Sequence, residues 1–297
     1  MVQVRRVPHP TQERIAAQKP CPSLPVWLGL FASLLTMVGG IWDISWHRTS
    51  GRDSFWSPPH LFAIGAAAVI RVGLIVALVH ERHPAAKGAV PWQPELSWRR
   101  TTVADWVLLL LLSLLLGNLT FALGECDYLD TSRAPFLYPI LASLAAPVAL
   151  VAGIRTVGRV GTATLIALLL TLQREIATPL LLAAGFVPPS PAPLYLVPAI
   201  IMDLWFWLVR RTDESAWKSV AAGILFAWIF IGTEYGYTAY LTGIVWSMRP
   251  LALSEPLACI AGAVSALAGH HFARWLLRPH PSVTPLPGTE NGKRRPR

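Results

Sequence analysis

The residue types best suited to chemistry gather in one short stretch near the N-terminus. Asp43 and His47 are four residues apart. If a helix continues through both, their side chains lie on one face, one turn apart. His60 follows two prolines, which favour the first turn of a second helix. A hairpin between the two helices would bring His60 back beside the first pair.

One carboxylate and two imidazoles form a suitable ligand set for a divalent transition metal. Imidazole suits copper, zinc and iron, and copper is bound most tightly of the divalent first-row series. Three protein ligands also leave coordination positions for water, oxygen or a substrate. Asp53, Ser57 and Arg52 are candidates to orient these ligands. The alternative is that the polar residues hydrate at an interface, cap a helix or pair with a nearby arginine.

The elements that must position these ligands are membrane helices. Of 297 residues, 54% are hydrophobic and 14% are charged, whereas soluble domains carry about 25% charged residues. Several windows of about twenty residues hold at most one charge, which is the length that crosses a hydrocarbon core of ~30 Å. Apolar runs such as 107–116 lack alternation, which excludes a barrel. The sequence predicts an all-α, polytopic transmembrane bundle of about eight spans, with seven as the alternative count.

Proline and glycine mark most of the predicted boundaries. Residues 1–24 are expected to be a cytoplasmic N-terminal segment, 25–278 the transmembrane bundle, and 279–297 a disordered basic tail. The first apolar run is interpreted as a retained helix, because no small-residue cleavage site follows it. We predict helices over 25–45, 59–80, 103–125, 134–153, 160–184, 192–210, 217–248 and 256–277.

The distribution of charge predicts the orientation. Basic residues lie before the first predicted helix, after the even-numbered helices (Arg155 after the fourth) and in the tail, whereas the intervening loops are acidic or neutral. Under the positive-inside rule both termini are cytoplasmic in a cell (inner) membrane. This placement explains the formal charge of +9 and argues against nucleic acid as a partner. We expect membrane lipid as a partner, together with other membrane subunits or a homo-oligomer.

A resemblance to a known family points to copper. Ten of the eighteen positions from Asp43 to His60 match the metal-binding segment of the C subunit of the copper membrane monooxygenases, the particulate methane and ammonia monooxygenase family. The resemblance implies that Asp43, His47 and His60 are copper ligands. The matching residues, with no gap, are Asp43, Trp46-His47, Thr49, Arg52-Asp53, Trp56, Ser57-Pro58 and His60.

The sequence also departs from that family. Family members carry a later Asn-Glu-Trp-Gly-His-Thr segment, whose Asn and His contribute to an adjacent copper position. The nearest counterpart here runs from Thr233 to Thr238 and has Thr and Tyr at those two places. The resemblance implies oxygen activation at copper, a small apolar or amine substrate, and separate partner chains, including a soluble copper-bearing subunit.

Ionisable residues also fall inside the predicted spans. Each costs a few kcal/mol near the bilayer centre unless it is paired or hydrated, so all should face the bundle interior. They could form a proton or ion path from the outer site, or simple ion pairs between helices. A charged network is predicted for Arg71, Arg174, Glu175, Asp203, Glu234 and His270, whereas the adjacent His271 points about 100° away from His270.

Three functions fit these observations. The first is a copper-dependent membrane oxidoreductase of the monooxygenase type, or a subunit of one, with iron or zinc as alternative metals. The second is a metal or small-solute transporter that uses the Asp/His/His site where its solute enters. The third is a non-catalytic structural or assembly subunit of a membrane complex.

Overall fold

The computed structural model describes residues 24–50, 58–62, 67–82, 98, 101–120, 137–183, 193–209, 215–242 and 248–278. Within these ranges the chain is helical and contains no strand. The helices are α1 (Leu24–Ser50), α2 (Pro58–His60), α3 (Ala67–Arg82), α4 (Val103–Thr120), α5 (Leu137–Val157), α6 (Thr162–Ala183), α7 (Pro193–Leu208), α8 (Ala216–Thr242) and α9 (Met248–Leu276).

The eight predicted helices correspond to the long helices, with shifted ends. The first was expected to stop at 45 but continues to Ser50, and the fourth runs to Val157 and not 153. The last begins at Met248, eight residues earlier than predicted, and holds Pro256 inside it. Apolar length sets where a span ends, whereas a helix continues through polar residues as long as its backbone bonds are made. The region predicted as 59–80 contains α2 and α3, and residues 63–66 between them lie outside the described residues.

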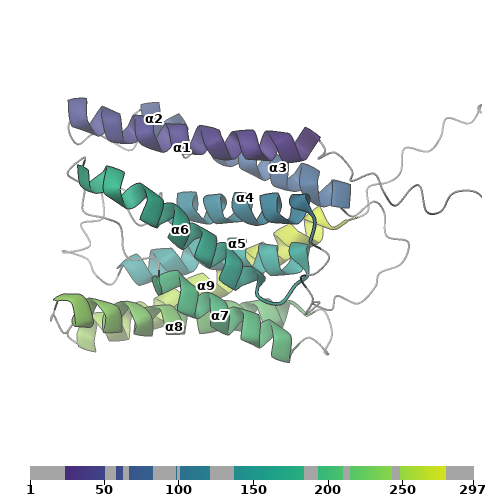
Figure 1. Ribbon diagram of the computed structural model, residues 1–297. Helices are drawn as coiled ribbons and strands as arrows, with labels where there is room; N and C mark the ends of the chain where they lie inside the picture. Colours follow the sequence, from purple (N-terminus) through teal and green to yellow (C-terminus); the bar gives the residue numbers. More distant parts are fainter. Residues whose placement is uncertain are drawn as a thin grey trace, which may run out of the picture.

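The long helices alternate in direction and form two groups that share a central core (Figure 1). On one side α1 packs against α3 and α4, and on the other α8 packs against α7 and α9. Helices α4, α5 and α6 lie between these groups and contact one another. The N-terminal end of α1 and the C-terminal end of α9 lie at the same end of the bundle (Figure 1).

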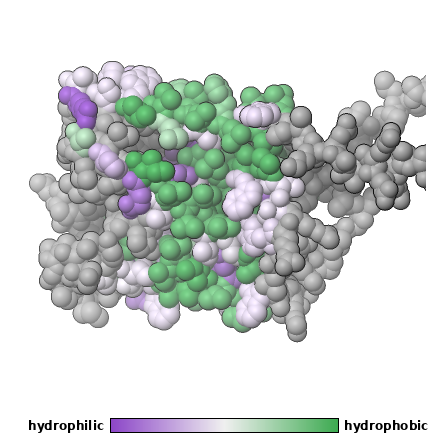
Figure 2. All heavy atoms as spheres, viewed as in Figure 1, coloured by the Kyte–Doolittle hydropathy of each residue, from purple (hydrophilic) through white to green (hydrophobic). Residues whose placement is uncertain are grey.

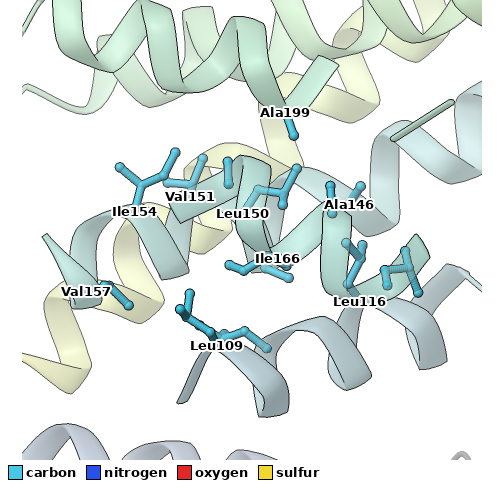
Figure 3. Packing of buried hydrophobic residues seen from close by; sticks show 14 of the residues in the cluster. Leu109, Leu116, Ala146, Leu150, Val151, Ile154, Val157, Ile166 and Ala199 are labelled. Atoms are coloured by element: carbon cyan, nitrogen blue, oxygen red, sulfur yellow. The ribbon is translucent and has the colours of Figure 1, made fainter. Parts of the chain in front are cut away.

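The core is built around α5, which is rich in alanine. Ala146 and Leu150 of α5 are fully buried and lie near Leu109 of α4, Ile166 of α6 and Ala199 of α7 (Figure 3). Small side chains let neighbouring backbones approach closely, and tight packing drives helix association in membranes. The composition of α5 therefore explains its central position.

A short turn joins α5 to α6. It begins and ends with glycines of positive φ, Gly158 at 69° and Gly161 at 88°, a conformation that glycine adopts without steric cost. Trp98 covers this turn, since its Nε1 donates to the carbonyl oxygen of Val160 at 2.9 Å. The guanidinium carbon of Arg159 lies 5.7 Å from the centroid of the same ring. The turn is thus fixed by aromatic packing at the end of the bundle.

The described helices are those of a multi-pass membrane protein. Five are long and apolar enough to cross a bilayer: α1, α4, α5, and most of α8 and α9. Helices α3 and α7 are apolar but shorter, with 16 residues each. Leucine, isoleucine, valine and tryptophan side chains are exposed on the outer helix faces, and apolar residues cover much of the visible surface (Figure 2). Such a surface needs a lipid environment.

Candidate metal centre and buried polar groups

The backbone of α1 meets the first condition for the predicted metal site. Helix α1 is unbroken through positions 43 and 47, so both residues occupy one helix, one turn apart. Near its end the hydroxyl of Thr49 donates to the carbonyl oxygen of Trp46 at 3.0 Å. This is a local bond of a threonine side chain to the backbone of the preceding helical turn. The helix therefore continues beyond the apolar segment.

The second condition concerns the position of α2. Helix α2 ends at position 60 and packs against α1, beside its C-terminal part (Figure 1). The rings of Trp42 and Phe62 lie 6.0 Å apart with an interplanar angle of 58°. Trp42 directly precedes position 43, and Phe62 lies two residues after position 60. The chain thus folds back along the last turns of α1, as the hairpin interpretation expects.

Of the three predicted ligands, Asp43 is half-buried on α1. The side chains of His47 and His60 lie outside the described residues, as do Arg52, Asp53 and Ser57. Among the side chains that the structure does describe, no three His, Cys, Asp or Glu residues are grouped as metal ligands. The side chains of the two histidines are not among them, so the ligand set remains a prediction.

The residues present fit the metal that the resemblance implies in two respects. The donor set has the carboxylate and imidazole chemistry that copper, zinc and iron accept. The backbone register places two of the three positions on one helix and the third on a segment packed against it. Two donors from one helix and one from a neighbouring segment is a common way to build an open three-ligand site.

The predicted intramembrane network is divided among different helix interfaces. Arg71 of α3 is fully buried, and its Nη1 donates to the carbonyl oxygen of Leu114 on α4 at 3.3 Å. A charged group inside a membrane span can be stabilised by a hydrogen bond to a backbone carbonyl, and this bond is of that kind. Arg71 therefore contributes to the α3–α4 interface.

Arg174 of α6 belongs to a second polar cluster. Its Nη2 donates to the hydroxyl of Thr120 on α4 at 3.2 Å, and its guanidinium carbon lies 5.6 Å from the ring centroid of Tyr195 on α7. The hydroxyl of Tyr195 is 3.3 Å from that of Tyr138 on α5, and both rings pack against Phe230 of α8. This cluster connects five helices across the bundle.

Asp203 has a role that the sequence analysis did not anticipate. It is buried on α7, and its carboxylate accepts bonds from the backbone N–H of Ala163 at 3.2 Å and of Thr164 at 2.8 Å. The hydroxyl of Thr164 also donates to it at 2.7 Å. These amides belong to the first turn of α6, where intrahelical partners are missing. Asp203 thus caps α6 from a neighbouring helix, and its negative charge complements the helix dipole.

His270 lies in a third cluster, at the other end of the bundle from α2. Its Nδ1 is 3.4 Å from the hydroxyl of Ser219 on α8, which accepts a bond from Nε of Arg155 on α5 at 3.3 Å. All three residues are buried, whereas His271 is exposed. The two histidines differ in burial, as expected, but their rings remain in edge contact with centroids 5.4 Å apart. Arg155 was predicted to follow its helix, and it joins this cluster because α5 extends to Val157.

Two acidic residues complete the set. Glu175 was expected to face the interior but is exposed, because it follows Arg174 by one residue and the helix turns about 100° per residue. Glu234 is partly buried on α8, and its Oε2 has no hydrogen-bond partner among the described residues. Helix α8 packs against α5, α7 and α9, on the opposite edge of the bundle from α1 (Figure 1). The Thr233–Thr238 segment is therefore remote from the Asp43 region.

Comparison with protein-family models, curated proteins and solved structures finds no match to this chain.

Proposed function

We propose that this chain is an eight-span membrane protein that binds copper through Asp43, His47 and His60 and serves a membrane oxidoreductase. The observation that carries the proposal is the packing of Trp42 on Phe62, with ring centroids 6.0 Å apart. This contact supports a hairpin in which the segment bearing His60 returns to the helix bearing Asp43 and His47.

The chain's own residues would define the chemistry of the site. Asp43 would supply the anionic ligand and partly neutralise a divalent ion, while neutral imidazoles from His47 and His60 would complete a three-donor set. Copper, when bound, supplies one-electron redox chemistry. The open positions of a three-ligand site would admit oxygen or a substrate, and the family resemblance points to a monooxygenase-like enzyme or a subunit of one.

The described polar clusters favour this function over transport. Arg71, Arg174, Asp203 and His270 each make bonds at a different helix interface. These bonds stabilise helix packing and satisfy helix ends. In a transporter we would expect such groups to line one continuous path for the solute across the membrane.

Charge at the ends of the bundle supports the proposed orientation. Arg155, Arg159, Lys218 and Arg274 lie at the end where α5 and α9 finish and α8 begins. The positive-inside rule assigns that end to the cytoplasm of a cell (inner) membrane. The metal site would then face outward, with both termini cytoplasmic. Additional membrane subunits or a second copy of the chain would be its partners, together with lipid.

Metal analysis of the protein purified in native lipid tests the proposal. We expect about one copper per chain after growth in copper-replete medium, and loss of most of that copper in Asp43→Ala and His60→Ala. His271→Ala is the matched control, because it removes an exposed imidazole from α9 and should retain full copper. Equal copper in all four proteins, or none in the wild type, would reject copper binding at this site.

Two further measurements separate the rival functions. An oxidoreductase would show a reversible copper redox signal in sealed proteoliposomes without net copper uptake. A transporter would accumulate copper inside the vesicles, and that uptake would be lost in His60→Ala. A structural subunit would hold no metal, and its partner complex would fail to assemble when this chain is absent.

A further inference from the structure

The exposed face of α9 changes character at one point along the helix. From Leu253 to Ala268 its exposed side chains are apolar, and they recur every three or four residues as one stripe of a helix must. The large ones are 51% to 62% exposed, and they are Leu253, Leu257, Ile260 and Val264.

Beyond Ala268 the same stripe becomes cationic and aromatic. The exposed residues are His271, Arg274 and Trp275, which stand at positions i, i+3 and i+4 and so share one face of the helix, and Arg278, two residues beyond its end. We call these four residues the α9 basic stripe. No acidic residue occurs anywhere in 256–278. The carboxylate of α9, Glu255, precedes Arg274 by nineteen residues, about 28 Å at ~1.5 Å per residue, which is too far to neutralise the stripe.

The length of the apolar part matches a bilayer. His271 lies eighteen residues beyond Leu253, about 27 Å at ~1.5 Å per residue, which is close to the ~30 Å of a hydrocarbon core. The α9 basic stripe therefore begins where lipid headgroups begin. Two other exposed tryptophans, Trp106 in the first turn of α4 and Trp217 in that of α8, lie at the same end of the bundle, as an interfacial aromatic belt requires.

The geometry within the stripe suits one phosphate. Arg274 lies in the last turn of α9, and Arg278 lies two residues beyond its end, where its backbone N–H donates to the carbonyl oxygen of Trp275 at 3.3 Å. The chain therefore keeps turning after the helix, and both guanidinium groups can reach the same anion. Guanidinium groups bind phosphate oxygens through paired, charge-assisted hydrogen bonds. Trp275 lies between the two arginines in the sequence, and its ring is held by stacking on Phe272, with ring centroids 6.0 Å apart and an interplanar angle of 19°.

We propose that Arg274 and Arg278, with Trp275 between them, bind the phosphate of an anionic phospholipid at the membrane boundary. The occupant is a lipid and not free phosphate, because the apolar stripe that continues from the site would lie along its acyl chains. The cationic charge selects phosphatidylglycerol-type over zwitterionic headgroups. This site is separate from the Asp43 region and does not depend on metal.

Lipid retention measured by native mass spectrometry tests the proposal. The wild type is reconstituted in nanodiscs of mixed phosphatidylglycerol and phosphatidylcholine and then released with its tightly bound lipid. We expect retained phosphatidylglycerol in preference to phosphatidylcholine, and about thirty-fold weaker retention in the Arg274→Gln/Arg278→Gln double variant, since each surface arginine contributes about 1 kcal/mol. Thermal unfolding of each protein would verify that the fold is intact.

Arg48→Gln is the matched control. Arg48 is an exposed arginine at the C-terminal end of α1, at the opposite end of the bundle, so its loss should leave retention unchanged. Unchanged retention in the double variant, or an equal loss in Arg48→Gln, would overturn the site. Displacement of the lipid by millimolar inorganic phosphate would overturn its assignment to a lipid.

Discussion

Trp42, near the end of α1, packs its ring on Phe62, just beyond α2, with centroids 6.0 Å apart. The two residues are twenty positions apart in the sequence, so their contact closes the connection between the first two predicted spans. Each flanks a predicted metal-binding position at a distance of one or two residues. The packing of two aromatic rings is thus a described contact between the two segments that carry the predicted ligands.

Removing this ring contact should loosen both the hairpin and the metal site. We expect Trp42→Ala to destabilise the protein by about 1 kcal/mol, the typical value of an aromatic pair. Copper affinity should fall by up to about five-fold, because ~1.4 kcal/mol corresponds to a factor of ten. Thermal unfolding and copper titration measure the two effects. Trp27→Ala, at a 58% exposed position of the same helix, should change neither, and similar losses in both variants would contradict the assignment.

The contact between α8 and α9 should not tolerate an added methyl group. A Cβ on Gly223 would lie 2.1 Å from the carbonyl oxygen of Gly262, and a Cβ on Gly262 would lie 2.3 Å from the carbonyl oxygen of Gly223. Backbone atoms cannot rotate away, so Gly223→Ala must separate the helices. We expect a loss of stability of about 1–3 kcal/mol, seen as a lower unfolding temperature in detergent.

Gly232 provides the control on the same helix. A Cβ there meets nothing within 4 Å, so Gly232→Ala should be neutral, or stabilising by about 0.5–1 kcal/mol through improved helix propensity. If Gly223→Ala were as stable as Gly232→Ala, that result would contradict the close backbone contact between α8 and α9.

Loss of the cap that Asp203 provides should weaken the start of α6. In Asp203→Ala the amides of Ala163 and Thr164 lose their buried acceptor, which should cost about 1–3 kcal/mol. Asp203→Asn should recover part of this, because its amide oxygen can still accept a hydrogen bond from one of these donors. Hydrogen exchange at the first turn of α6 is the measurement, and faster exchange is expected in both variants. Glu175→Ala, at an exposed position on α6, should exchange like the wild type.

Hydropathy and turn residues were sufficient to predict a helical membrane bundle and the approximate position of each long helix. They could not predict where helices continue past their apolar segments. Arg155 was therefore interpreted as a loop charge, although it is buried inside α5 and bonded to Ser219. The cap that Asp203 forms on α6 is also invisible to sequence patterns, because its partners are forty positions away and depend on how α7 packs.

The candidate metal site stays a prediction, and the structure describes only the helix and the neighbouring segment that would carry its ligands. The spacing of Asp43 and His47 places them one turn apart on one helix face only if the helix continues past both residues. Helix α1 does continue, to Ser50. The approach of His60 depends instead on a turn and on aromatic packing between separate segments. Spacing alone gives no such tertiary information, whereas the family resemblance supplied the ligand set as an expectation.

Electron paramagnetic resonance of the copper(II)-loaded protein in native lipid tests the central claim most directly. The nitrogen splitting on the copper signal reports how many imidazoles bind the ion. We predict a pattern from two nitrogen ligands in the wild type and in His271→Ala, and from one in His60→Ala. A wild-type spectrum that shows no nitrogen splitting, or that is unchanged by His60→Ala, would contradict metal binding at the α1–α2 hairpin.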